Sequence, residues 1–371
     1  MPLAKNYFFL GNTPDLSLLE LQTLYPGDFA LVAKAIASYP HQLDLASLPR
    51  LGGTRKVALE LAVVSLKELD AKLVELIVSD ESGKNVALTS YLPEGMEPPA
   101  VIRIKKAVSV SRPVRFVSMD TDEHELLMLS HQHVAEFNLI AQDKKIIIAK
   151  TVWIYDAEDW VSRDRSKPYR DIKRGMLPPK VARIMVNLAT RGQSGLTLAD
   201  PFCGTGTVLS EAIMVGNNVI GGDTNPEAIP GTKSNLEWIL STPGINQATY
   251  DLYLADATHF DEVVKSVDCI ATEPYMGPLL DERNPSSLEK IKNIAKGLDK
   301  LYRGAFKAFY RVLPVGGRVV MSIPTFHVYN RIIPTISLDS LSSLGYNHIS
   351  EVGYAKPGAA VVRNITILEK K

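Results

Sequence analysis

The fold of this chain is decided by residues 198–209, Leu-Ala-Asp-Pro-Phe-Cys-Gly-Thr-Gly-Thr-Val-Leu. A short apolar strand, predicted over 196–199, ends in Asp200, passes a glycine turn at 204–206 and enters a helix predicted over 207–215. In open α/β sheets, ligands bind outside the carboxyl ends of the strands, at turns of this kind. The segment therefore predicts both the fold class and the position of a ligand site.

The same order of strand, turn and helix recurs through the C-terminal part. Strands are predicted at 218–222, 250–254, 269–272 and 317–323, and helices at 180–189, 226–240 and 287–312. Two more strands, near 349–354 and 361–368, are joined by Lys356-Pro357-Gly358. This alternation predicts an α/β fold with a doubly wound, mostly parallel, Rossmann-like sheet, in which the closing hairpin places one antiparallel strand.

Three ligand types compete for the glycine turn. A phosphate-binding loop needs a Lys-Ser/Thr pair after its glycines, and Leu209-Ser210 supplies no lysine. A dinucleotide fingerprint needs a small residue where Leu209 stands, and the carboxylate of Asp200 would repel a pyrophosphate. S-adenosyl-L-methionine fits better, because Asp200 can approach its ammonium and sulfonium while Gly204 and Gly206 let the backbone come close.

Two further strands end in acids. Asp223 ends the strand after the glycine turn, near the spacing at which an acid accepts hydrogen bonds from ribose hydroxyls. Asp256 follows the next strand, where it could accept the adenine amino group. Aspartates at strand ends are also turn formers and helix caps, so this purely structural interpretation stays open for each acid alone. Three acids after three successive strands favour a nucleoside site.

The fourth strand of this part leads into Thr272-Glu273-Pro274-Tyr275-Met276-Gly277-Pro278. Here the chain resembles the amino-group methyltransferases, which carry an Asp/Asn-Pro-Pro-Tyr motif, and within them the THUMP-domain tRNA guanine N2-methyltransferases that modify position 10 of tRNA. Other segments similar to that family are 8–17, 51–56, 163–168, 175–183 and 200–207. The motif departs from the family pattern, because Glu273 takes the place of the usual Asp in one register and Thr272 in the other. We favour the first register.

The resemblance implies a class I S-adenosyl-L-methionine-dependent methyltransferase domain and a set of site residues. The catalytic motif would be Glu273, Pro274 and Tyr275. The cofactor-binding residues would be Asp200, Pro201, Cys203, Gly204, Thr205, Gly206, Thr207, Asp223, Asp256, Ala257 and Thr272. An exocyclic amine on a base is a poor nucleophile, so the site must hold its nitrogen in line with the methyl group. Glu273 or a nearby carbonyl would stabilise the N–H as charge develops, and Tyr275 would stack on the extruded base.

Composition narrows the class of protein further. The chain has 371 residues, 46% of them hydrophobic and 22% charged, with a formal net charge of +0. These values exclude a disordered chain and a globally polycationic nucleic-acid binder. Two cysteines cannot build a disulfide framework or a four-cysteine zinc site, which favours a reducing, cytoplasmic setting. The apolar runs are too short for a signal peptide or a membrane span, and His131-Gln132-His133 lacks companion ligands, so we predict no membrane and no metal.

The N-terminal part has an α+β texture, with strands predicted at 5–11, 56–64, 85–91 and 144–155 and helices at 14–25 and 66–78. With the resemblance, residues 1–64 are interpreted as a ferredoxin-like region and 65–155 as a THUMP-like RNA-binding domain. A linker at 156–179 and the methyltransferase domain at 180–371 follow. Two strongly basic segments, 101–118 and 161–183, are candidates for contact with RNA phosphates.

The resemblance thus implies an enzyme that methylates the exocyclic N2 of a guanosine in structured RNA, with tRNA the favoured substrate. Two alternatives stay open. An N6-adenine or N4-cytosine DNA methyltransferase would use the same Pro-Tyr motif, although no base-reading domain is visible. A catalytically silent RNA-binding protein of the same fold would account for the altered motif. The number of methyl groups, the target nucleotide, the oligomeric state and a need for a small activating partner protein are left open.

Overall fold

The computed structural model describes residues 4–117, 129, 133–171, 176–245, 248–278, 287–356 and 358–371. The chain folds into two compact units. One comprises Met1–Leu18 and Tyr25–Asp159, and the other comprises Leu19–Leu24 and Trp160–Lys371. Some residues singled out in the sequence lie outside the described part: Ser118, His131, Gln132, Lys173, Arg174, Gly175 and Pro357.

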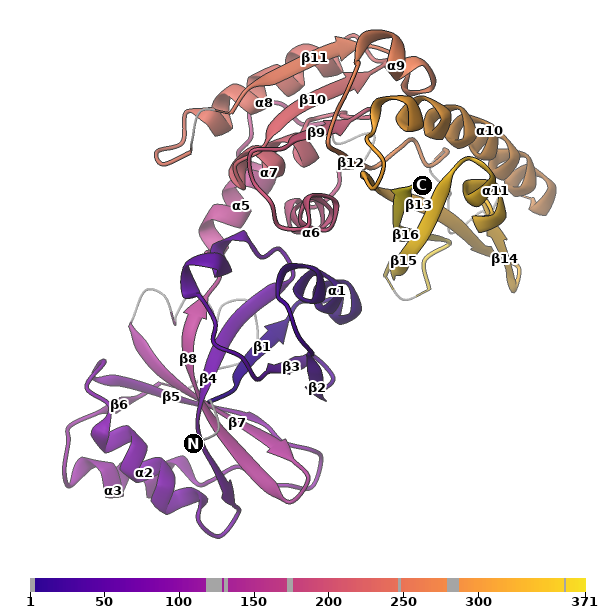
Figure 1. Cartoon of the computed structure of the whole chain (residues 1–371). Coiled ribbons are helices and arrows are strands. Elements are labelled where there is room, and N and C mark those ends of the chain that lie inside the picture. Colours follow the sequence, from indigo (N-terminus) through magenta and orange to yellow (C-terminus); the bar gives the residue numbers. More distant parts are fainter. Residues whose placement is uncertain are drawn as a thin grey trace. The chain divides into compact units, whose positions relative to one another are not determined.

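The N-terminal unit is built on an eight-stranded sheet with the order β2-β3-β1-β4-β8-β7-β5-β6 (Figure 1). Its strands are β1 (Asn6–Leu10), β2 (Ala30–Ala33), β3 (Ile36–Tyr39), β4 (Thr54–Ser65), β5 (Asn85–Tyr91), β6 (Arg115–Phe116), β7 (Val134–Gln142) and β8 (Lys145–Ile154). The long β4 pairs with β1 on one side and with β8 on the other. The predicted regions 1–64 and 65–155 therefore share one sheet.

Helices α2 (Leu69–Ser79) and α3 (Val101–Ser109) pack on one face of this sheet (Figure 1). Leu69, Leu73 and Ile77 recur every four residues along α2 and are buried, which gives the helix one apolar stripe. This stripe forms a cluster with buried residues of α3 and of the strands: Ile104, Val108, Phe137 and Ile148. Two further helices of the first third are α1 (Pro14–Leu24) and the 3-10 helix η1 (Leu45–Arg50).

The second unit contains a sheet in the order β11-β10-β9-β12-β13-β16-β15, with β14 paired to β13. Its strands are β9 (Thr197–Asp200), β10 (Asn218–Asp223), β11 (Tyr250–Leu254), β12 (Cys269–Thr272), β13 (Arg318–Val328), β14 (Arg331–Pro334), β15 (Tyr346–Tyr354) and β16 (Val361–Lys370). Strands β9 to β13 pair parallel, and β16 runs antiparallel between β13 and β15. The predicted doubly wound sheet, closed by one antiparallel strand, is confirmed for this unit.

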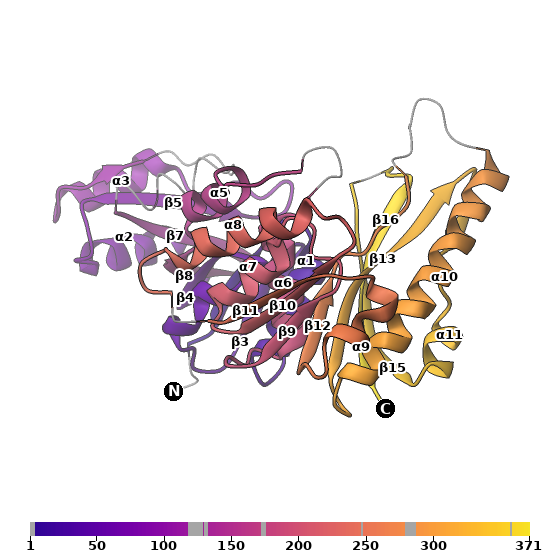
Figure 2. The ribbon, with the colours of Figure 1, turned by 90° about the horizontal axis from the view of Figure 1, so that it is seen from above.

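Helices cover both faces of the second sheet (Figure 2). On one side α6 (Pro179–Thr190) packs on α7 (Thr207–Met214), and α7 packs on α8 (Ala228–Leu240). On the other lie α9 (Phe260–Val263), α10 (Leu288–Val312) and α11 (Leu338–Ser343), which share a core with the strands. Within the described ranges, no helix combines the length and the apolar character needed to cross a membrane.

Of the described α-helices, α3, α5, α9 and α11 lie where the sequence analysis predicts none, and two of them change the interpretation of a segment. Helix α5 (Ala157–Arg165) occupies the first part of the predicted linker 156–179, and its Trp160 and Arg163 are buried. Helix α3 occupies half of the basic segment 101–118, with Ile104 and Val108 turned into the core. The first part of the predicted linker is therefore a packed element of the C-terminal unit.

Candidate active site

The glycine turn joins the end of β9 to the start of α7. Gly204 and Gly206 have φ angles of 53° and 74°, in the left-handed region that favours glycine. A Cβ atom on Gly206 would lie 2.7 Å from the methyl carbon of Thr232, so a side chain there would collide with α8. The backbone N–H of Gly206 donates to the carbonyl of Cys203 at 2.6 Å, which closes the turn. The predicted turn is thus confirmed, and it requires glycine on two grounds.

Asp200 is a buried carboxylate at the end of β9, with 2% of its surface exposed. Its Oδ1 accepts hydrogen bonds from the Thr272 hydroxyl at 2.5 Å and from the backbone N–H of Phe202 at 3.1 Å. Burial raises the pKa of Asp200 to about 7; the two hydrogen bonds oppose this, and the carboxylates of Asp223 and Glu273 add to it. A buried carboxylate with this pKa is suited to a cationic ligand, whose charge would favour the ionised form.

Asp223, at the end of β10, shapes the turn directly. Its Oδ2 accepts from the backbone N–H of Gly204 at 2.9 Å, and its Oδ1 accepts from the N–H of Asn225 at 2.8 Å. Each carboxylate oxygen has a second lone pair, so these bonds leave capacity for a ribose hydroxyl. The structural interpretation and the functional one are therefore both compatible with Asp223.

Asp256 follows β11 and acts as the N-cap of the 3-10 helix η2 (Ala257–His259). Its Oδ1 accepts from the backbone N–H and the hydroxyl of Thr258, both at 2.8 Å. The side chain is exposed, whereas Ala257 is buried. The capping alternative thus holds for Asp256, and its recognition of adenine stays a prediction.

The segment after β12 places the predicted catalytic motif next to Asp200. Thr272 is fully buried and its hydroxyl is engaged by Asp200, which favours Glu273 as the residue at the acidic position of the motif. The Oε1 atom of Glu273 accepts from Nε of Arg363 at 3.0 Å. Pro274 is buried, while the side chain of Tyr275 is 59% exposed and its carbonyl accepts from the Tyr302 hydroxyl at 2.8 Å. A fixed backbone thus presents an open aromatic ring.

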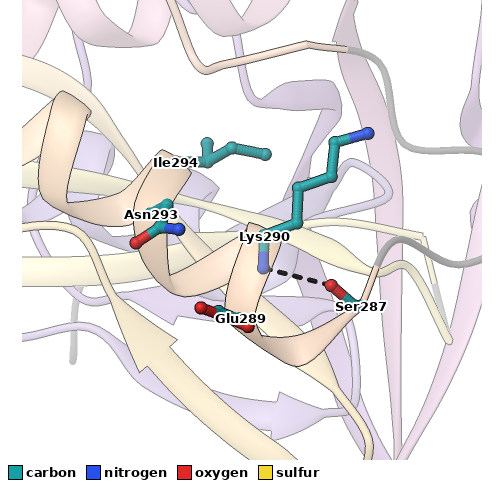
Figure 3. A pocket seen from close by; sticks show the side chains of 5 residues that line it. All are labelled: Ser287, Glu289, Lys290, Asn293 and Ile294. Carbon is teal, nitrogen blue, oxygen red and sulfur yellow. Dashed lines mark hydrogen bonds between the residues drawn. The ribbon is translucent and has the colours of Figure 1, made fainter.

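A shallow hollow of about 450 Å³ lies at the start of α10 (Figure 3). It is lined by Ser287, Glu289, Lys290, Asn293 and Ile294. Figure 3 shows the hydroxyl of Ser287 accepting from the backbone N–H of Lys290, at 3.3 Å, which caps the helix. Ile294 also packs on Gly277, where a Cβ would come within 3.0 Å of its methyl carbon. The hollow therefore borders the segment that carries the predicted catalytic motif.

Sequence reasoning missed a clamp behind the glycine turn, made by Asn235 of α8. Its Oδ1 accepts from the backbone N–H of Tyr169 at 2.8 Å, and its Nδ2 donates to the carbonyls of Tyr169 at 2.9 Å and Thr205 at 2.8 Å. Lys167, which lies two residues before Tyr169 in the sequence, is buried. Its ammonium group donates to the hydroxyls of Thr207 at 2.9 Å and Thr205 at 3.3 Å. Burial lowers the pKa of Lys167. The turn is thus held from both of its flanks.

A buried ion cluster corrects the interpretation of the basic segment 161–183. Glu211 of α7 pairs with Arg163 of α5 and, at 2.7 Å, with Arg183 of α6. The guanidinium of Arg163 stacks on Trp160 at 3.8 Å from the ring centre. Arg163, Arg183 and Lys167 therefore face the protein interior and cannot contact RNA phosphates, whereas Arg165 and Arg170 are exposed. Burial of an arginine requires such a partner, which the sequence places far away.

Comparisons with known proteins place the chain among methyltransferases. Residues 167–335 match the RMKL-like methyltransferase domain family. The tRNA (guanine(10)-N2)-dimethyltransferase of Methanothermobacter thermautotrophicus is 30% identical over 171 residues, 45% of this chain and 45% of the relative. The enzyme of the same name from Pyrococcus abyssi is 30% identical over 199 residues, 53% of this chain and 50% of the relative. The chain thus spans about half the length of these curated relatives.

A third relative is matched over most of its own length. The probable tRNA (guanine(10)-N2)-dimethyltransferase of Methanothermococcus thermolithotrophicus is 36% identical over 120 residues, which make up 31% of this chain and 69% of the relative. The matched range 167–335 includes the glycine turn, the three strand-end acids and the segment after β12. The chain therefore belongs to the tRNA (guanine(10)-N2)-dimethyltransferase family.

Proposed function

We propose that this chain is an S-adenosyl-L-methionine-dependent methyltransferase that modifies the exocyclic N2 of a guanosine in tRNA. The observation that carries the proposal is the convergence of Asp200, Asp223 and Glu273 at the carboxyl ends of the adjacent parallel strands β9, β10 and β12. The names of the curated relatives support tRNA and the N2 of guanine as substrate and target.

The residues at the glycine turn fit the cofactor chemically. Asp200 would face the ammonium and sulfonium, Asp223 the ribose hydroxyls and Asp256 the adenine amino group. The backbone of the turn would lie against the ligand, with the remaining predicted contacts from Pro201, Cys203, Gly204, Thr205, Gly206, Thr207, Ala257 and Thr272. The raised pKa of Asp200, caused first by burial, supports this assignment, because a bound cation would offset the cost of ionising that carboxyl. The cofactor would supply an electrophilic methyl group.

The motif after β12 would hold the acceptor base. Glu273 would accept a hydrogen bond from the target amine and stabilise the positive charge that develops on it. Tyr275 would stack on the base once it leaves its helix, which its exposed ring allows. Pro274 would fix the backbone between them. Positioning of the nitrogen in line with the methyl group would provide most of the catalytic effect.

The N-terminal unit would bind the RNA. Residues 1–64 are proposed as a ferredoxin-like region and 65–155 as a THUMP-like domain, the two sharing one sheet. The methyltransferase domain, predicted from 180 after a linker at 156–179, is proposed to include the packed residues from Trp160 onward. Arg103, Lys105 and Lys106 of α3 are exposed and would contact phosphates. A tRNA substrate would place the protein in the cytoplasm, and a small activating protein is a further proposed partner.

The test is methyl transfer to defined nucleic acids. The full chain is incubated with labelled S-adenosyl-L-methionine and either total tRNA or duplex DNA, and the nucleosides are separated by mass spectrometry. We expect N2-methylguanosine or N2,N2-dimethylguanosine in tRNA. Methylated adenine or cytosine in DNA would instead support the first alternative. Cofactor binding by calorimetry without transfer to any RNA would support a silent RNA-binding protein, and Asp200→Asn should weaken that binding at least tenfold.

A further inference from the structure

The ion pair between Arg363 and Glu273 connects the closing strands of the sheet to the catalytic motif. Arg363 lies on β16, in register with Pro324 of β13 on one side and Tyr354 of β15 on the other. Its Nε donates to Oε1 of Glu273 at 3.0 Å, and 35% of the arginine side chain and 16% of the glutamate side chain are exposed. Among the described residues, Arg363 is the hydrogen-bonding and ion-pair partner of the Glu273 side chain.

The charged and titratable groups around Glu273 make Arg363 important for the ionisation of this carboxyl group. Arg363 of β16 contacts Glu273 directly, and Asp200 of β9, Tyr302 of α10 and Tyr354 of β15 interact with it electrostatically. Burial raises the pKa of Glu273, and the charge and hydrogen bond of Arg363 oppose that rise. Of these neighbours within the described ranges, only Arg363 is cationic. The arginine is therefore the group that favours the ionised carboxylate.

The protonation state of Glu273 decides which base edge it can match. An ionised carboxylate only accepts hydrogen bonds, whereas a protonated one also donates. Guanine presents two adjacent donors, the N2–H of its target amine and the neighbouring ring N1–H. Adenine and cytosine each present an amino donor beside a ring nitrogen that accepts. An ionised Glu273 thus pairs with two donors of guanine, and it meets a lone pair in either of the other bases.

We propose that Arg363 is a positioning residue that holds Glu273 as an acceptor-only carboxylate and thereby sets the selection of guanine over adenine and cytosine. This inference rests on the proposed function and deepens it. Enzymes that read an extruded base do so through hydrogen bonds to its Watson–Crick edge. A site built around such bonds strongly rejects analogues that leave its polar groups unpaired.

The experiment uses the full chain and two tRNA transcripts that differ at the methylated position. One carries guanine, and the other carries 2-aminopurine, which keeps the target amine but has an acceptor at N1 in place of the donor and no oxygen at C6. We expect the wild-type protein to prefer guanine by roughly 10- to 100-fold in kcat/KM, the effect of one hydrogen bond to a charged group. Equal use of both bases would overturn the proposal without reference to any variant.

Variants then assign the effect to Arg363. Arg363→Met removes the cation, so guanine methylation should require a higher pH than in the wild type, and the preference over 2-aminopurine at pH 7 should shrink by about tenfold. Arg363→Lys should restore most of both properties. The matched control is Arg311→Met, which breaks the ion pair of Arg311 with Asp261 at 2.8 Å.

The outcomes separate this inference from the proposed function. A wild-type protein that methylates no guanosine contradicts the proposed function and, with it, the inference. A wild type active on guanosine, with Arg363→Met matching Arg311→Met in pH profile and base preference, overturns the inference alone. If Arg363→Met does not fold, Arg363→Lys and the wild-type preference for guanine still decide, since a lysine that keeps the charge must keep the preference.

Discussion

The hydroxyl of Thr272 lies 2.5 Å from Oδ1 of Asp200 and joins the carboxyl ends of β12 and β9. One of these strands leads into the proposed catalytic motif, and the other leads into the glycine turn. The hydrogen bond opposes the rise in the pKa of Asp200 that burial causes. The pKa of the carboxylate proposed to meet the cofactor thus depends on Thr272, which ends the strand that leads to the proposed base-binding motif.

The first prediction concerns the pH dependence of stability. The pKa of Asp200 is about 7 in the folded protein against 3.8 as its ordinary value, so between these values the folded state holds a proton that the unfolded state releases. Stability in the absence of ligand should therefore fall as pH rises through this window. Asp200→Asn should remove that component, so the variant gains stability relative to the wild type between pH 4.5 and pH 8. Denaturant unfolding at several pH values measures this, with Asp251→Asn as an exposed control.

The second prediction concerns the clamp on the glycine turn. Asn235→Ala removes three hydrogen bonds and leaves the buried carbonyl of Thr205 without this donor. We expect a loss of about 2–3 kcal/mol in the free energy of unfolding and at least tenfold weaker cofactor binding by calorimetry. Ser234→Ala, which removes a hydroxyl on the exposed face of the same helix, should change neither by a measurable amount. Unchanged cofactor affinity in Asn235→Ala would show that the clamp does not position the turn.

The third prediction separates backbone strain from steric collision. Gly206 and Gly244 both have positive φ angles, 74° and 86°. A Cβ on Gly206 would lie 2.7 Å from Thr232, whereas a Cβ on Gly244 would meet nothing within 4 Å. Gly244→Ala should therefore cost about 1 kcal/mol from strain and leave cofactor binding intact. Gly206→Ala should cost more and abolish binding. Thermal unfolding measures the stability of both variants, and calorimetry measures their cofactor affinity. Equal losses in the two variants would contradict the prediction.

The fourth prediction concerns the ion cluster around Glu211. Glu211→Gln removes from the buried guanidinium groups of Arg163 and Arg183 the carboxylate that pairs with both, so the free energy of unfolding should fall by about 3–5 kcal/mol. Asp261→Asn breaks a more exposed pair with Arg311 and should cost less than about 1 kcal/mol. Urea unfolding of the two variants gives the comparison. A small effect at Glu211 would mean that water reaches the cluster.

The second sheet could be predicted closely, because short runs of strand-forming residues alternate regularly along the chain with segments of helical periodicity. The predicted ranges 250–254 and 269–272 coincide with β11 and β12, and the predicted start of α10 at 287 is its capping residue. The first sheet was harder. Strand β7 was missed because Glu136 and Asn138 interrupt its apolar pattern. Glu136 is buried through Lys56, whose Nζ donates to its Oε1 at 2.5 Å from a strand 80 residues away.

The residues of the candidate site also fall into those that local sequence predicts and those that it does not. The strand-end acids and the glycines follow from local pattern, because parallel strands bring their carboxyl ends to one edge. Asn235, Lys167 and Arg363 act through partners distant in sequence, and each looks locally like an ordinary polar residue of a surface. Arg163 and Arg183 were misassigned to RNA contact for the same reason, since a charge pattern does not reveal a buried partner such as Glu211.

The cluster of Trp160, Arg163, Arg183 and Glu211 sets a lower limit on the length of any stable fragment that contains the C-terminal unit. The region matched to the methyltransferase family begins at residue 167. A polypeptide truncated there would keep Arg183 and Glu211 but lose both the indole and one of the two cations that surround the acid. The shortest fragment that folds on its own should therefore start before Trp160. The start of the family match and the start of the stable unit thus differ by about two helical turns.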